Sequence, residues 1–103
     1  MIISRKYWTR SKENKVPRLK DRGHKCYAEG STHNPMTTFG LYYINNIPVF
    51  EENHSNNNSQ HYSSIFTIIG YRDQLDETKS KIEKKLGVEL EYYNLNPILE
   101  AIT

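Results

Sequence analysis

Residues 65–93 constrain the fold more than any other part of this chain, because they are predicted to form a strand, a helix and a second strand with short connections. Residues 65–69 are apolar on both alternating faces and rich in β-branched side chains, which predicts a buried strand. Residues 73–86 carry apolar side chains at helical spacing, and Gly87 supplies a C-terminal stop. Residues 88–93 alternate between apolar and polar side chains, which predicts a strand with one wet face.

Two strands joined by a helix in this way form a βαβ unit, in which the strands run parallel and the crossover is right-handed. Asp73 is placed to cap the N-terminus of the helix. Asn96-Pro97, followed by apolar residues, predicts a short C-terminal helix that packs back on the sheet.

A hairpin is predicted upstream of this unit. Residues 41–44 and 47–50 are largely apolar and flank Asn45-Asn46, and asparagine tolerates the positive φ that a two-residue hairpin turn requires. Pro48 has no N–H to donate, so it belongs at a sheet edge or with its donor side outward. The predicted fold class is therefore α+β: a small mixed β-sheet (hairpin plus βαβ unit) with one main helix at 73–86 and a short C-terminal helix.

The chain is long enough for a single domain over residues 1–103. Residues 2–9 alternate in a way that allows a short edge strand, and residues 28–38 are predicted to be a turn-rich connection. Residues 51–60 contain no apolar side chain and are predicted to be a flexible Asn-rich loop. The basic N-terminal segment, residues 1–25, is predicted to be largely a mobile arm.

Charge is concentrated in this basic N-terminal segment. Residues 1–25 hold nine Lys or Arg against two Asp or Glu, a net charge of +7, whereas the remainder holds five against ten, a net charge of −5. A positive segment of this kind attracts phosphates or an acidic protein surface over about 8 Å at physiological salt.

Aromatic side chains lie among these cations. Tyr7 and Trp8 sit within the run Arg5 to Arg10, and bases of single-stranded nucleic acid stack on aromatic rings beside cationic groups. The sequence therefore predicts a non-enzymatic protein that binds nucleic acid. The candidate binding residues are Arg5, Lys6, Trp8, Arg10, Lys12, Lys15, Arg18, Lys20, Arg22 and Lys25. The alternative is that Tyr7 and Trp8 are core aromatics flanked by solvated cations.

A protein partner is the second hypothesis, with the same positive segment occupying an acidic or nucleic-acid-binding site on a larger protein. The small size, the Asn-rich loop and the lone βαβ core resemble the general style of small host-takeover or anti-defence proteins of phages. This resemblance implies an inhibitor or adaptor function. Pairing of an edge strand, either 2–9 or 88–93, with a second copy would instead give a homodimer.

Enzymatic and metal chemistry have weaker support in the sequence. His24, Cys26 and His33 are spaced unlike known zinc motifs, so we expect no metal and no cofactor. A His-dependent ribonuclease would need His24 with His33 or Tyr27 beside cationic phosphate binders, and it is kept as a minor alternative. A single cysteine and the lack of a long apolar run predict a cytoplasmic protein that does not enter membranes.

Overall fold

The computed structural model describes residues 1–13, 15–33, 36–56 and 61–93. The elements, in chain order, are β1 (Ile3–Ser11), the 3-10 turn η1 (Leu19–Arg22), β2 (Ala28–His33), β3 (Met36–Ile44), β4 (Ile47–Asn56), β5 (His61–Gly70), α1 (Arg72–Leu86) and β6 (Glu91–Tyr92). The predicted C-terminal helix lies outside the described residues.

The strands form one sheet in the order β2-β3-β4-β5-β1-β6, and every pairing is antiparallel. The α+β class is confirmed, but the mixed sheet is wrong. Strands β5 and β6 run in the same direction, as a βαβ unit requires, yet β1 lies between them and pairs antiparallel with both. The helical crossover spans two strand spacings, about 10 Å, which leaves room for the inserted strand.

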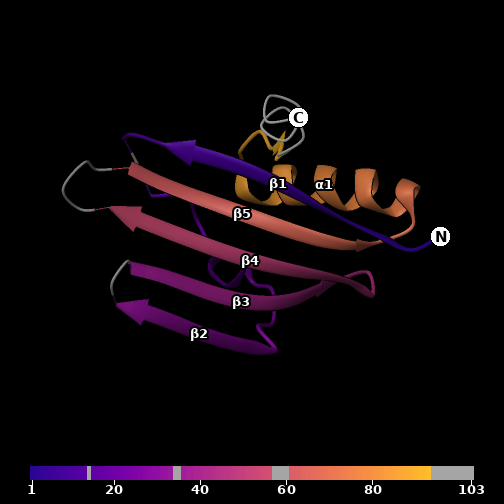
Figure 1. Cartoon of the computed structure of the whole chain (residues 1–103), viewed down its shortest axis with the longest axis horizontal. Helices are drawn as coiled ribbons and strands as arrows, with labels where there is room; N and C mark the ends of the chain where they lie inside the picture. Colours follow the sequence, from indigo (N-terminus) through magenta and orange to yellow (C-terminus); the bar gives the residue numbers. More distant parts are fainter. Residues whose placement is uncertain (14, 34–35, 57–60, 94–103) are drawn as a thin grey trace, which may run out of the picture.

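One face of the sheet is covered and the other is not. Helix α1 packs against β5 and β1 on the covered face, and η1 packs beside the helix. Figure 1 shows α1 behind β1 and β5, with the uncovered face of the sheet toward the viewer. The core on the covered face is Tyr7, Leu19, Tyr42, Ile44, Val49, Phe66, Ile68, Leu75, Ile82, Leu86 and Leu90.

Helix α1 forms close to its predicted position. Leu75, Thr78, Ile82 and Leu86 are its buried residues and lie on one stripe. The helix begins one residue earlier than predicted, and the backbone N–H of Tyr71 donates to Oε1 of Gln74 at 2.9 Å in place of a cap by Asp73. Gly87 ends the helix in the left-handed region at φ 69°, as predicted.

The hairpin between β3 and β4 is also confirmed. Asn45 and Asn46 have φ values of 49° and 66°, which suit a two-residue turn that matches the twist of the strands. Pro48 faces Tyr43 of β3, and the pairing of β4 with β5 begins only at Val49. The missing N–H of Pro48 therefore interrupts no ladder, although β4 itself is an inner strand.

The basic N-terminal segment is not a free arm. Residues 2–9 were predicted to form an edge strand, but β1 lies inside the sheet, between β5 and β6. In this position Tyr7 buries its ring on the covered face, opposite Phe66. After β1, the chain packs against the sheet through Val16 and Leu19, which are 6% and 0% exposed. Burial of these two aliphatic side chains contributes to the docking of residues 15–22 on the body.

Two segments predicted as loops are strands instead. Residues 28–33 form β2, and residues 51–56 continue β4, so the loop prediction for 51–60 is wrong over the described part of that range. The predictions failed because backbone ladder bonds and a buried polar network, rather than apolar side chains, order these residues.

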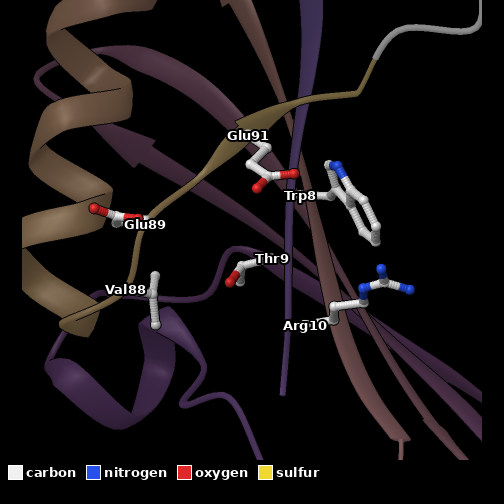
Figure 2. Close-up of a pocket in the computed structure, with 6 residues that line it drawn as sticks. All are labelled: Trp8, Thr9, Arg10, Val88, Glu89 and Glu91. Carbon is white, nitrogen blue, oxygen red and sulfur yellow. The ribbon is translucent and has the colours of Figure 1, made fainter. Parts of the chain in front are cut away.

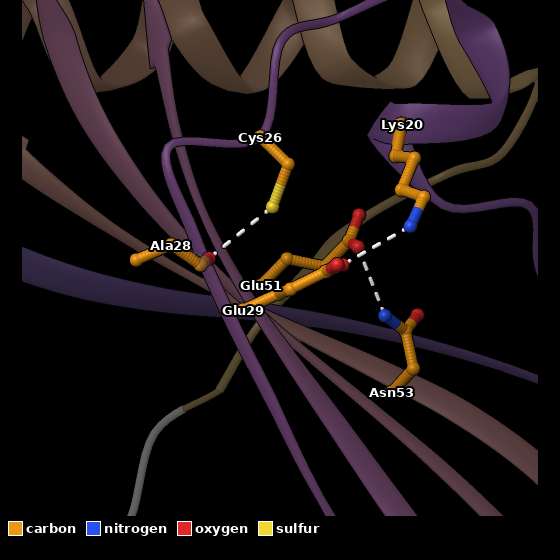
Figure 3. A network of polar contacts seen from close by, with 6 residues as sticks. All are labelled: Lys20, Cys26, Ala28, Glu29, Glu51 and Asn53. Carbon is orange, nitrogen blue, oxygen red and sulfur yellow. Dashed lines mark hydrogen bonds and ion pairs between the residues drawn. The ribbon is translucent and has the colours of Figure 1, made fainter.

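That network centres on Glu51, which is 1% exposed. Its carboxylate accepts the backbone N–H of Leu19 and the side-chain amide of Asn53, both at 2.9 Å, and Asn53 in turn accepts Ser64 Oγ at 2.7 Å. Figure 3 shows Glu51 and Asn53 beside the exposed ion pair of Lys20 and Glu29. Loss of solvation raises the pKa of Glu51, whereas the bonds from Asn53 and Leu19 lower it.

The ring of Tyr42 lies so close to the backbone at residue 40 that only glycine leaves room for it. A Cβ at Gly40 would lie 2.7 Å from Cε2 of Tyr42, whose side chain is 1% exposed and has no room to move. We expect Gly40→Ala to lower the free energy of unfolding by about 1–3 kcal/mol through overpacking, measured by urea denaturation. The matched control is Gly30→Ala on β2, where a Cβ meets no atom within 4 Å. Equal stability of the two variants would contradict this steric reason.

Candidate nucleic-acid interface

The uncovered side of the sheet, called the open face below, carries aromatic, aliphatic and cationic side chains in register. Lys6 lies opposite Thr67, which lies opposite Phe50, and Phe50 lies opposite Leu41. The adjacent row places Trp8 opposite Ile65. The residues that define the open face are Lys6, Trp8, Arg10, Phe39, Leu41, Tyr43, Phe50, Ile65 and Ile69.

Alternation along β1 places three of the candidate residues on this one face. Lys6, Trp8 and Arg10 have the same parity, opposite to that of the buried Tyr7. The guanidinium of Arg10 lies 4.8 Å from the centre of the Trp8 ring, and Tyr93 meets the same ring edge-on at 6.1 Å. Figure 2 shows Trp8 and Arg10 on one side of β1 and Thr9 on the other. Trp8 is thus held in place while part of its ring remains accessible.

A second aromatic pair lies across the open face on β3 and β4. The rings of Phe39 and Phe50 are stacked at 5.9 Å with an angle of 19° between their planes. Phe50 is 37% exposed and Tyr43 is 44% exposed, so aromatic surface is available to a ligand at both positions. The sequence-based prediction began the first hairpin strand at residue 41, which left Phe39 outside it, and it assigned no face of the sheet to Phe50 in the second strand.

A cavity of about 450 Å³ adjoins Trp8 where the short β6 begins. Its lining combines Trp8, Thr9 and Arg10 of β1 with Val88, Glu89 and Glu91 from the chain that follows α1 (Figure 2). Glu91 lies directly opposite Trp8 in the β1–β6 pairing. A base stacked on Trp8 would therefore have carboxylate acceptors beside its edge.

Arg5 and Tyr7 do not join the open face. Arg5 points to the covered face, where its guanidinium lies 3.9 Å from the carboxylate of Asp76 and 5.3 Å from the centre of the Tyr92 ring. Its pKa is raised, chiefly by its hydrogen bond to the hydroxyl of Tyr7. Tyr7 is 3% exposed, so the prediction that it stacks on bases is wrong, and the core alternative is right for this residue.

The other six candidates are spread over the N-terminal part of the chain. Lys12 and Lys15 are exposed in the segment that follows β1, whereas Arg18, Lys20, Arg22 and Lys25 lie in or beside η1. Lys20 pairs with Glu29 at 3.0 Å, and the ammonium of Lys25 lies 4.8 Å from the Tyr27 ring centre. Within the described residues, only Arg5 and Lys20 of the ten candidates form ion pairs with carboxylates. Most of the positive charge is therefore not neutralised by carboxylates. It is divided, however, between the open face and the region around η1.

The histidine and cysteine candidates do not converge on a site. His33 is exposed on β2, and Cys26 donates its Sγ hydrogen to the carbonyl of Ala28 at 3.2 Å. In the described ranges, no group of three His, Cys, Asp or Glu side chains is arranged to hold a metal ion. The one long helix there, α1, is too short and too polar to cross a membrane.

Comparison of the chain with protein-family models, with curated proteins and with solved structures finds no match.

Proposed function

We propose that this protein binds single-stranded nucleic acid on the open face of its sheet. The observation that supports this best is the placement of Trp8 between Lys6 and Arg10 on one exposed side of β1. In this arrangement a base stacks on the accessible part of the Trp8 ring, and the two cations contact the phosphates on either side. The protein carries out no chemistry on the strand.

The energies of these contacts suit a binding protein of moderate affinity. Stacking of a base on an aromatic side chain contributes about 1–3 kcal/mol, and it tolerates any sequence because every base has a flat face. Phe50 and Phe39 provide a second stacking position across the sheet. Duplexes bury the faces of their bases, so this surface favours unpaired strands.

Salt dependence separates contact on the open face from contact with the whole basic segment. Each phosphate contact with a single strand contributes about −0.7 to the slope of log affinity against log salt. Contacts by Lys6 and Arg10 alone therefore predict a slope of about −1.4, whereas five contacts along residues 1–25 would give about −3.5. The measurement is fluorescence anisotropy of labelled 12-nucleotide RNA and DNA of mixed sequence, titrated with protein at several salt concentrations. Absence of any binding at low salt would reject the proposed function.

A protein partner is the second candidate, and one observation favours it. Leu41 and Ile65 are half-buried on the open face and Ile69 is 43% exposed there, and aliphatic side chains of this kind suit a protein surface better than a base. Retention of a stoichiometric, nuclease-resistant protein by the tagged chain would support an inhibitor or adaptor. We further propose a reducing, cytoplasmic location, because the single cysteine, Cys26, has no partner for an internal disulfide.

A further inference from the structure

A second cavity, of about 400 Å³, lies on the helix side of the sheet, away from the open face. Three parts of the chain meet around it: the residues after η1, the turn between β3 and β4, and the C-terminal half of α1. The residues that line it are His24, Ile44, Asn45, Lys81, Lys84 and Lys85.

The lining is cationic and includes no carboxylate. Lys81, Lys84 and Lys85 are spaced by three and four residues, so their side chains emerge on one side of the helix. Lys81 is paired with Glu77 at 3.0 Å, but Lys84 and Lys85 form no ion pair within the part of the chain that the structure describes. The cavity therefore has an excess of positive charge that the neighbouring residues leave uncompensated.

His24 gives a second sign of this excess. Burial lowers the pKa of His24, and the positive charge of Lys85 lowers it further. The titratable groups that line the cavity together with His24 are the three lysines of α1, and the turn between β3 and β4 contributes only Ile44 and Asn45. An anion in the cavity would reverse this effect and favour the protonated imidazole.

We propose that this cavity binds the terminal phosphate of a small phosphoester. Lys84 and Lys85 contact the phosphate oxygens, and His24 donates a hydrogen bond to them. Ile44, which is 6% exposed, forms an apolar wall for the organic part of the ligand, and the side-chain amide of Asn45 offers a further donor.

The site is independent of the proposed function, because none of its residues belongs to the open face. Trp8→Ala is therefore expected to leave phosphate binding unchanged. Failure of nucleic-acid binding would likewise leave this proposal standing.

Pyrophosphate is the probe, and the imidazole signals of His24 are followed by NMR, with assignment through His24→Asn. We expect saturable binding of pyrophosphate, a rise in the pKa of His24 when the site is filled, and tighter binding as the pH falls through that pKa. The double variant Lys84→Gln/Lys85→Gln should weaken binding by about tenfold or more, because charge-assisted hydrogen bonds are lost. Lys79→Gln is the control, since Lys79 pairs with Glu83 and lies over the Tyr7 ring instead of lining the cavity.

Three outcomes would overturn the proposal. The first is an unchanged pKa of His24 at millimolar pyrophosphate. The second is equal weakening by Lys79→Gln and the double variant, which would indicate a diffuse counterion effect only. The third is a response of His24 to a 12-nucleotide strand but not to pyrophosphate, which would assign the cavity to phosphodiesters of nucleic acid.

Discussion

Trp8→Ala is expected to weaken the binding of a 12-nucleotide single strand by about 5-fold to 150-fold, because base stacking on an aromatic ring contributes about 1–3 kcal/mol. The variant removes the ring that Arg10 and Tyr93 hold on the open face, while both cations remain. The salt slope should stay unchanged, since no phosphate contact is lost. Anisotropy of the labelled strand measures both quantities.

Tyr92→Ala is the matched control for this variant. Tyr92 is 53% exposed on the neighbouring strand β6, but its ring contacts Arg5 and Tyr7, whose side chains point to the covered face. It should bind the strand like the unmodified protein. Trp8→Phe, which keeps a flat ring, should recover part of the lost affinity. Normal binding by Trp8→Ala together with a loss of binding in Tyr92→Ala would place the strand on the covered face and contradict the proposed role of the open face.

Glu51→Ala is expected to lower the free energy of unfolding by about 2–4 kcal/mol, because buried donors left without an acceptor cost about 1–3 kcal/mol each. The carboxylate is the acceptor for the backbone N–H of Leu19 and the amide of Asn53. It thereby fastens η1 and the preceding residues to β4. Urea denaturation followed by circular dichroism measures the change.

The matched control is Glu29→Ala, which removes a solvent-exposed carboxylate that contacts Lys20 of η1. Its ion pair with Lys20 is exposed on both sides, and such pairs contribute about 0–1 kcal/mol.

The dependence of stability on pH gives a further check of the network around Glu51. The pKa of Glu51 is raised on folding, so its contribution to stability is full below the ordinary glutamate pKa and is lost as pH rises through the folded value. This dependence of stability on pH should disappear in Glu51→Ala. Equal stability of Glu51→Ala and Glu29→Ala would contradict the role of the network.

Docking of η1 makes Arg18 part of the folded body as well as a candidate binding residue. Arg18 is half-buried, its backbone N–H donates to Asp21 at 3.1 Å, and its positive charge lowers the pKa of Glu51. Reversing the charge of Arg18 would place a carboxylate near a buried carboxylate and disturb folding as well as binding. Lys6 and Arg10 are the better positions for reversal, because both side chains are exposed on the open face.

Local signals predicted the elements that depend on neighbouring residues in the chain. The helix at Arg72–Leu86, its glycine stop and the Asn45-Asn46 turn follow from spacing and backbone preference alone. The position of β1 between β5 and β6 does not, because it is set by burial of Tyr7 against residues about sixty positions away. The strand at residues 51–56 was missed for a related reason: its order comes from pairing partners on β3 and β5.

The candidate site was predicted in part. Alternation in residues 3–10 separates Arg5 and Tyr7 from Lys6, Trp8 and Arg10, but the sequence does not say which set faces the helix. Only the packing of α1 on one side decides that Trp8 is accessible. The contribution of Phe39 and Phe50 depends on the register of β3 against β4, which brings the two rings together from residues eleven positions apart.

Intrinsic fluorescence during titration with a single-stranded oligonucleotide tests the central claim most directly, because Trp8 is the only tryptophan in the chain. A base that stacks on Trp8 should quench its emission in a saturable way, and added salt should restore the signal as the strand dissociates. Emission that stays constant while anisotropy shows the strand bound would place the nucleic acid elsewhere on the protein and contradict the proposed role of the open face.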